Sequence, residues 1–286
     1  MRYSYKDTLD ELKNTLEGIT SVIIYTGAGM GVDSGLEVFR GNQGLWEKYP
    51  EARNLNMSFQ DLANPYHLEK YPDLVVPFYR DRLETYLDTE PHKGHQTLLE
   101  LAESLEDGYF CCTSNVDGHL QKAGFSPEKI HEIHGQISYW QCTVFRCAES
   151  SAAPLFTIPR QSESKDHPRC PTCNALARPN LLMFYDLGWL DNEFAKQSRR
   201  KNEFLNHRLE HNKGKTAVIE LGAGHAIPSI RMEAELTAED FKTKLIRINP
   251  EDMQPCEERN EGIINLQCSA LEGIKLIKQC FDEANQ

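Results

Sequence analysis

The sequence predicts an α/β protein, with a doubly wound parallel sheet and a smaller second domain. Three observations support this expectation. Short, wholly apolar runs recur along the chain, as in strands buried on both faces of a parallel sheet. Amphipathic segments with apolar residues at helical spacing lie between them. Two long stretches, residues 41–93 and 141–180, interrupt the alternation. The length of 286 residues suits one large or two modest domains.

The individual elements follow this pattern in order. Residues 8–18 carry leucines at 9, 12 and 16, and Gly18 suits the end of a helix. Two further amphipathic helices are expected over residues 94–106 and 270–283. Buried strands are expected at residues 21–26, 109–113, 217–221, 244–249 and 262–266. Strands that alternate with helices in this way favour a parallel, Rossmann-like sheet.

The charge balance bears on the partners of the chain. Lysine and arginine number 31 against 43 aspartates and glutamates, which gives a net charge of −12. Because the chain is acidic and has no dense basic run, we expect no nucleic-acid partner. We expect no membrane partner either, since no apolar stretch approaches the length of a membrane span. The polar first 18 residues do not resemble a signal peptide, so we expect a cytoplasmic protein.

Nine cysteines, an odd number, argue against a disulfide framework in such a chain. Four of them form two short chelating pairs separated by 22 residues: Cys142 with Cys147, and Cys170 with Cys173. This spacing favours one tetrahedral zinc ion with four thiolates, which leaves no position for water and is therefore structural. The alternative is four free surface thiols. A nucleic-acid-binding finger is disfavoured because the segment lacks a basic recognition helix.

We therefore expect two domains, each assembled from separate segments. Residues 8–40, 94–140 and 181–283 would form the Rossmann-like domain. The smaller domain would combine residues 41–93, which are aromatic, charged and largely helical, with residues 141–180, a zinc-binding module. The zinc would stabilise an insert whose apolar content is too small to fold alone.

A glycine-rich segment follows the first predicted strand, Gly27-Ala28-Gly29-Met30-Gly31. Glycines at the carboxyl end of a parallel strand let backbone N–H groups approach a phosphate. The alternative is a simple strand-to-helix turn. The fingerprint of hydride-transferring dehydrogenases is incomplete, because position 32 is valine and no acidic residue closes a second strand about 20 residues later. Arg40 could donate to a phosphate or ribose. These residues indicate a nucleotide site of another kind.

Seven motifs, in order, resemble those of the sirtuin family of NAD-dependent protein deacylases. They are Gly27-Ala28-Gly29 with Ser34-Gly35 and Phe39-Arg40, Thr113–Asp117, His134-Gly135, the cysteine quartet, Arg178-Pro179-Asn180, Leu221–Gly224 and Ile248-Asn249-Pro250. The likeness runs from about residue 8 to about residue 283. The resemblance implies a protein-lysine deacylase. This would be a deacetylase or, if acidic acyl groups are removed, a desuccinylase or demalonylase. Such an enzyme acts on an acylated-lysine protein and releases nicotinamide and O-acyl-ADP-ribose.

The resemblance also implies roles for individual residues. Taken alone, Asn115 and Asp117 after a strand would be turn formers, and His134 would be structural. By resemblance, the first two line the nicotinamide pocket and His134 is the catalytic base. A neutral imidazole with a pKa near 6.5 can accept a ribose hydroxyl proton. NAD would be held by Gly27, Ala28, Gly29, Ser34, Phe39, Arg40, Ser114, Asn115, Asp117, Gly222, Ala223, Gly224, Asn249 and Cys268.

The chain departs from the family pattern at several positions. Ser114 replaces a usual glutamine and Gly31 a usual serine. The longer departures are Glu37-Val38 for Pro-Asp, Phe184-Tyr185-Asp186 for Phe-Gly-Glu, and Gly222-Ala223-Gly224 for Gly-Thr-Ser. These departures concern substrate choice and turnover more than NAD binding.

The acyl group is expected to meet Leu182 and Phe184, and a Tyr-x-x-Arg pair formed by Tyr79 and Arg82. That pair resembles the one with which a class of sirtuins holds acidic acyl groups, since a guanidinium and a phenol suit a carboxylate. The alternatives are a solvated helix face and a local pairing of Arg82 with Tyr86 or Glu84.

Two other functions remain open from the sequence. A protein ADP-ribosyltransferase or an NAD-hydrolysing effector could use the same fold. A non-enzymatic nucleotide sensor is disfavoured, because Asn115, Asp117 and His134 are all present.

Overall fold

A computed structural model describes residues 5–37, 42–150, 154–164, 166–210, 215–251 and 262–285. Phe39 and Arg40, which the sequence assigns to nucleotide binding, lie outside these ranges. None of the described helices is both long enough and apolar enough to cross a membrane.

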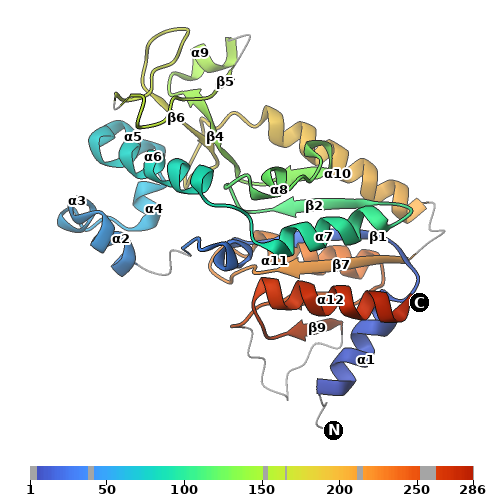
Figure 1. The fold of residues 1–286 in the computed structure, drawn as a ribbon. Helices are drawn as coiled ribbons and strands as arrows, with labels where there is room; N and C mark the ends of the chain where they lie inside the picture. The colour runs from blue at the N-terminus through green and yellow to red at the C-terminus, as the bar shows by residue number, and fades with distance from the viewer. Residues whose placement is uncertain are drawn as a thin grey trace.

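A six-stranded parallel sheet forms the centre of the molecule (Figure 1). Its strands are β1 (Ile19–Thr26), β2 (Tyr109–Thr113), β3 (Ile130–Glu132), β7 (Lys215–Leu221), β8 (Leu245–Ile248) and β9 (Ile263–Leu266). Their order is β3-β2-β1-β7-β8-β9, so the connections leave in opposite directions on either side of the β1–β7 pair. Doubly wound sheets bind ligands at the carboxyl ends of the strands at this point. The predicted fold class is confirmed.

All five predicted strands are present, and β3 is the additional one. Its three residues, Ile130–Glu132, are all buried. A run this short shows no periodicity, so the sequence gives no signal for it.

Helices cover both faces of the sheet. On one face lie α1 (Tyr5–Leu16), α7 (Lys93–Ser104) and α12 (Ala270–Ala284). On the other lie α10 (Asn192–Glu210) and α11 (Ser229–Asp240). Alternate residues of β1 pack into the two cores: Val22 and Ile24 into the first, Ile23 and Tyr25 into the second. The sheet is therefore buried on both faces, as its apolar strands require.

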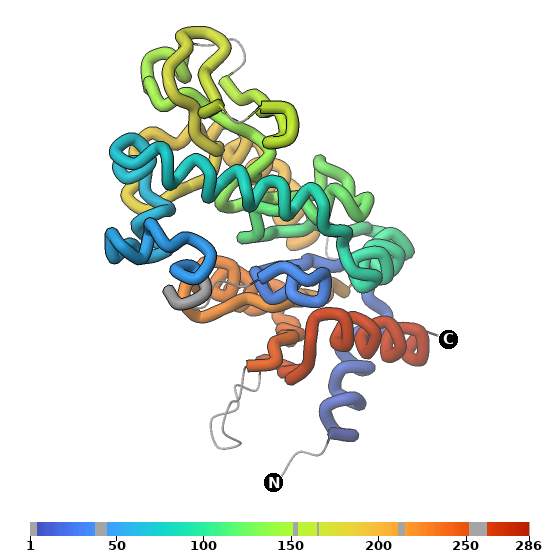
Figure 2. The backbone as a smooth tube through the Cα atoms, turned by 60° about the vertical axis from the view of Figure 1, so that its left-hand side comes forward, coloured from blue at the N-terminus to red at the C-terminus, as the bar shows by residue number. Residues whose placement is uncertain are grey.

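The helical stretch forms five helices, α2 (Asn42–Lys48), α3 (Pro50–Asn54), α4 (Phe59–Leu62), α5 (Pro65–Lys70) and α6 (Pro72–Asp88). In Figure 1, β2 points toward this stretch, and the tube in Figure 2 shows it next to residues 135–181. Those residues contain an antiparallel sheet of β4 (Gly135–Cys142), β5 (Leu155–Phe156) and β6 (Ala177–Leu181), with α9 (Phe145–Ser150) following β4. The sequence does not predict this sheet, because neither β4 nor β6 alternates cleanly between apolar and polar residues.

The two parts of this region share one core. Val75 and Phe78 of α6 belong to the same buried cluster as Trp140 of β4 and Ala177 of β6. The helical module and the antiparallel sheet therefore pack as one body beside the carboxyl ends of the parallel strands.

Candidate active site

Two loops cross at the point where the strand order reverses. The first follows β1 and leads into the short helix η1 (Ala28–Ser34), and the second follows β7. Gly29 N–H donates to the carbonyl of Gly222 over 2.9 Å, and a Cβ built on Gly29 would lie 2.7 Å from Gly222 Cα. Gly222 also has φ = +64°. Only glycine allows this approach, so the two loops are fixed by their backbones.

A third loop, after β8, completes this arrangement. Asn249 donates from Nδ2 to the carbonyl of Ala223 over 2.9 Å, and Arg231 of α11 donates to the same oxygen over 3.2 Å. Asn249 and Ala223 are both buried. Gly224 is exposed, and a Cβ built on it would meet no atom within 4 Å. Space in front of Gly224 is therefore open, whereas Asn249 holds the loop.

Asn115 connects β2 to the first glycine loop. Its Nδ2 donates to the carbonyl of Gly27 over 2.9 Å, and its backbone N–H donates to Thr113 Oγ1 over 3.0 Å. Thr113 Oγ1 in turn accepts from Thr26 Oγ1 over 2.7 Å. These bonds fix the Asn115 carboxamide at the carboxyl edge of the sheet.

Asp117 lies two residues further on, half-buried. Burial raises the pKa of its carboxyl, while His119 and Arg82 oppose the rise. Its Oδ1 accepts the backbone N–H of His119 over 2.8 Å. Arg82, one of the charged groups that oppose this rise, belongs to α6.

His134 follows β3 and lies beside the end of β2. Its Nδ1 is 3.3 Å from the carbonyl oxygen of Ser114, which can only accept a hydrogen bond. Nδ1 therefore carries the proton, and Nε2 keeps its lone pair. Burial lowers the pKa of His134, so the ring is neutral at physiological pH. These are the properties of a general base.

The glycine after His134 is required by the packing. Gly135 has φ = +79°, and a Cβ there would lie 2.2 Å from the carbonyl oxygen of Asn180. The carbonyl of His134 accepts the N–H of Leu182 over 3.0 Å. The histidine is therefore positioned by the start of β4 and the end of β6.

The two members of the predicted Tyr-x-x-Arg pair have different surroundings in the structure. Tyr79 is buried, with its hydroxyl 3.5 Å from the carbonyl of Leu62, and burial raises its pKa. Arg82 is half-buried, donates to the hydroxyl of Tyr86 and lies 5.4–5.8 Å from the rings of Phe59, Phe78 and Tyr86. Glu84 pairs instead with Arg160. This helix edge is an aromatic surface with one guanidinium, whereas a solvated face would expose Tyr79.

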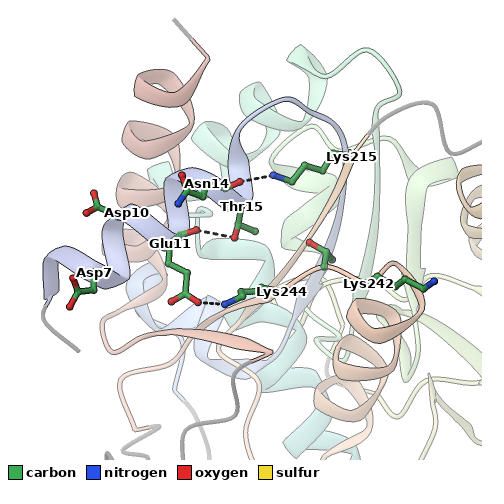
Figure 3. Close-up of a pocket in the computed structure, with 9 residues that line it drawn as sticks. Asp7, Asp10, Glu11, Asn14, Thr15, Lys215, Lys242 and Lys244 are labelled. Atoms are coloured by element: carbon green, nitrogen blue, oxygen red, sulfur yellow. Dashed lines mark hydrogen bonds and ion pairs between the residues drawn. The ribbon is translucent and has the colours of Figure 1, made fainter. Parts of the chain in front are cut away.

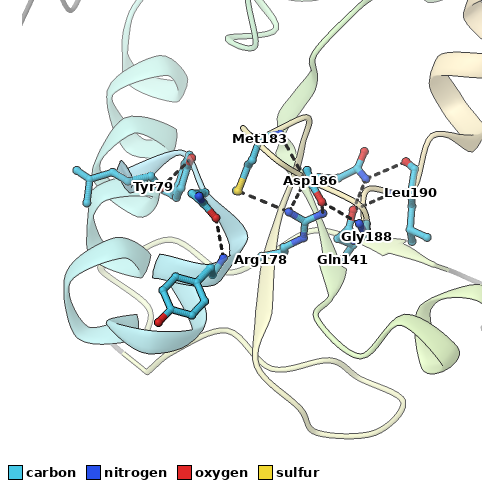
Figure 4. Close-up of polar contacts among 11 residues, drawn as sticks. Tyr79, Gln141, Arg178, Met183, Asp186, Gly188 and Leu190 are labelled. Atoms are coloured by element: carbon cyan, nitrogen blue, oxygen red, sulfur yellow. Dashed lines mark hydrogen bonds and ion pairs between the residues drawn. The ribbon is translucent and has the colours of Figure 1, made fainter. Parts of the chain in front are cut away.

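Leu182 and Phe184 lie in a loop that folds around a buried ion pair. Arg178 makes two hydrogen bonds to Asp186, of 2.6 and 2.9 Å, and the two side chains are 4% and 0% exposed (Figure 4). Asp186 also accepts the N–H groups of Met183 and Gly188. Phe184 N–H donates to the carbonyl of Ala63 over 2.8 Å, and Leu182 is 42% exposed. The sequence marks Asp186 only as a departure from the family pattern.

A cavity of about 380 Å³ lies beside this loop. Its wall includes Asn64, Tyr66, Arg178, Tyr185 and Leu187. A larger cavity of about 530 Å³ lies at the opposite edge of the sheet, by the amino ends of β7 and β8. There Lys244 forms an ion pair with Glu11, and Lys215 donates to the carbonyl of Asn14 (Figure 3). That cavity shares no residue with the site described above.

The four cysteines come together at the far end of the antiparallel sheet. Their sulfur atoms all lie within 4.8 Å of one another, with Cys142 and Cys173 3.5 Å apart and Cys147 and Cys170 3.9 Å apart. Although burial opposes it, backbone N–H donors from Cys173 and Thr172 lower the pKa of Cys170 to about 7. Four thiols converging in this way fit a tetrahedral zinc ion.

The remaining predicted residues lie at the edges of the glycine loops. Ser34 accepts the backbone N–H of His92 over 2.9 Å. Ala28 is exposed. Cys268 is half-buried after β9, and burial raises its pKa to about 11. His92 and Arg231 support these loops without a signal in the sequence, because the fold alone brings them there.

Comparison with known proteins agrees with these features. The Sir2 family model matches residues 27–204. An NAD-dependent protein deacylase of Leptospira interrogans is 28% identical over 246 residues, covering 86% of this chain and 87% of that protein. One from Candida albicans is 30% identical over 218 residues, covering 62% and 69%. A crystal structure of a Sir2 homolog–NAD complex shares the fold, with a TM-score of 0.70, 22% identity, and coverage of 96% and 95%.

Proposed function

Because this chain belongs to the Sir2 family, we infer that it is an NAD-dependent protein deacylase that acts on acylated lysine. The orientation of His134 carries the proposal. Its Nδ1 proton is directed to the Ser114 carbonyl, next to Asn115, whose amide is bonded to the first glycine loop. A neutral base and the loops that would hold a nucleotide therefore converge at one edge of the sheet.

We propose that NAD binds across the crossing loops. The backbone there carries no side chain at Gly27, Gly29 and Gly222, and the space next to Gly224 is open. Bound NAD supplies a ribose carbon that takes the acyl oxygen when nicotinamide leaves. Ala28, Ser34, Ser114, Asn249 and Cys268 would line the rest of the nucleotide site, together with Phe39 and Arg40.

The chain's own groups would then serve the chemistry. Asn115 and Asp117 would face the positive charge that develops at the ribose, since a fixed dipole and a carboxylate stabilise such charge. His134 Nε2 would accept a ribose hydroxyl proton, because Nδ1 already carries one. Asp117 and His134 are both half-buried, so the site is only partly exposed to water.

We propose that the acyl chain lies against α6, near Arg82, with Leu182 and Phe184 on the opposite wall. Arg82 supports this because it acts on Asp117 electrostatically and is surrounded by three aromatic rings. A guanidinium there favours a carboxylate, so we expect succinyl- or malonyl-lysine to be preferred over acetyl-lysine. Tyr79 would shape the pocket from its buried position.

The zinc ion is structural. It would join the two cysteine pairs and so hold the tip of the antiparallel sheet, whose cysteine cluster includes few other apolar side chains. The sheet begins at Gly135, directly after His134. We retain the division into a sheet domain and a smaller domain, and the cytoplasmic location, as predictions.

Mass spectrometry of the products tests the function. The protein is incubated with NAD and peptides that carry acetyl-, succinyl- or malonyl-lysine. We expect free lysine, nicotinamide and O-acyl-ADP-ribose in equal amounts. ADP-ribosylated protein would point to the transferase alternative, and free ADP-ribose without deacylated peptide to NAD hydrolysis. NAD binding without any nicotinamide would indicate a sensor.

A further inference from the structure

A second group of metal-ligating side chains lies beneath α10 and α11, on the sheet face opposite α1, α7 and α12. It consists of Cys112 of β2, His131 of β3 and Glu233 of α11. One ligand atom from each lies within 4.8 Å of the other two. Among the described residues, this is one of two groups of at least three such side chains, the other being the cysteine quartet.

Strand register creates the group. Cys112 and His131 are direct partners in the parallel pairing of β2 with β3, so their side chains emerge from the same face of the sheet. Cys111, one residue earlier, points to the opposite face and packs into the other core. Glu233 reaches the pair from α11 above.

The surroundings of His131 also indicate that a ligand binds here. It is 2% exposed, and neither ring nitrogen has a hydrogen-bond partner in the described part of the chain. Buried polar atoms are normally paired, so an unsatisfied imidazole facing a thiol and a carboxylate calls for a ligand. By contrast, both ring nitrogens of another buried histidine, His92, have hydrogen-bond partners, the carbonyl of Met30 and the N–H of Gly94.

Burial disfavours charge on the side chains of this group. Together with Lys201 it lowers the pKa of His131 to about 4, and together with Glu233 it raises the pKa of Cys112. Lys201 forms an ion pair with Glu233 at the edge of the group, so it would compete with a metal ion for this carboxylate.

We propose that Cys112, His131 and Glu233 bind one zinc ion, separate from the ion of the cysteine quartet. Thiolate, imidazole and carboxylate are the three ligand types that zinc accepts in proteins. Binding would release the thiol proton of Cys112 to solvent. The ion would connect β2 to β3 directly before the two loops in which Asn115 and His134 lie.

Counting metal in matched variants tests the proposal. Cys112→Ala and Cys111→Ala each remove a buried thiol from neighbouring positions of β2, so a general loss of stability should affect both. After zinc loading and removal of loose metal, we expect about two ions per chain in the wild type and Cys111→Ala, and about one in Cys112→Ala. Equal counts in the two variants would overturn the proposal, whatever the quartet holds.

A second pair of variants covers the case in which both cysteine variants fail to fold. Glu233→Gln changes a half-buried ligand at the rim, and Glu239→Gln changes an exposed residue of the same helix. Only the first should lose the second ion. Lys201→Met should bind Co²⁺ at this group about tenfold more tightly, because a neighbouring cation is removed. Unchanged or weaker Co²⁺ affinity in Lys201→Met would contradict a cation site.

Discussion

The two halves of the candidate site are held together by different means. At the crossing loops the two backbones are in direct contact, because Gly27, Gly29 and Gly222 leave no room for a Cβ, and the side chains of Asn115 and Asn249 add bonds to them. On the acyl side, α6 and the loop after β6 are held by side chains: the Arg178–Asp186 ion pair and the aromatic rings around Arg82. Backbone packing fixes one geometry, whereas side chains can be exchanged one at a time. We infer that the residues of the nucleotide half tolerate few substitutions, and that residues of the other half determine substrate choice.

His134 lies where the two halves meet, so its replacement should give the largest effect. His134→Ala should lower deacylation by about 10²–10⁴-fold, as expected for loss of a general base. NAD binding should persist, because the contacts that join the described parts of the crossing loops do not involve this ring. Single-turnover assays and NAD titration of the same preparation measure the two quantities. Deacylation near the wild-type rate would assign the base to another residue.

The second prediction tests whether side chains hold the acyl half. Arg178→Met leaves the Asp186 carboxylate buried without its partner, and should lower the free energy of unfolding by about 3–5 kcal/mol. The double variant Arg178→Met/Asp186→Leu removes both charges and should recover part of that loss. Urea unfolding of the two variants provides the comparison. If both single and double variants unfold like the wild type, the ion pair does not hold this loop.

The third prediction tests the rigidity of the nucleotide half with two glycines from one loop. A Cβ at Gly222 would lie 2.5 Å from the backbone of Gly29, whereas at Gly224 it would meet nothing within 4 Å. Gly222→Ala should therefore cost about 1–3 kcal/mol of stability, and Gly224→Ala much less. Thermal unfolding of both variants measures this difference. Equal stabilities would mean that the loops can separate without cost.

The same contrast explains what the sequence could predict. The cysteine quartet and the long apolar strands are local patterns, so spacing alone identifies them. By contrast, β3 is too short for a pattern, and Asp186 meets Arg178 only when the loop after β6 folds back against that strand. Cys112, His131 and Glu233 come from three elements and meet through strand register and helix packing. Contacts of this last kind leave no trace in the order of the residues.

The smallest expected effect concerns the acyl group, where one side chain of α6 is exchanged. Arg82 is the charged group that we place at the acyl pocket, so Arg82→Met should shift the ratio of succinyl-lysine to acetyl-lysine turnover by about tenfold toward acetyl-lysine. The neighbouring Asp81→Asn is the matched control, because Asp81 accepts from Tyr49 and Gln161 on another side of the helix. NAD affinity should be the same in both variants, since the contacts between the described parts of the crossing loops involve neither residue. Competition assays with both peptides in one tube give the ratio directly. If the wild type prefers acetyl-lysine and Arg82→Met leaves the ratio unchanged, the guanidinium only packs against its aromatic neighbours, and substrate choice must come from the loop after β6.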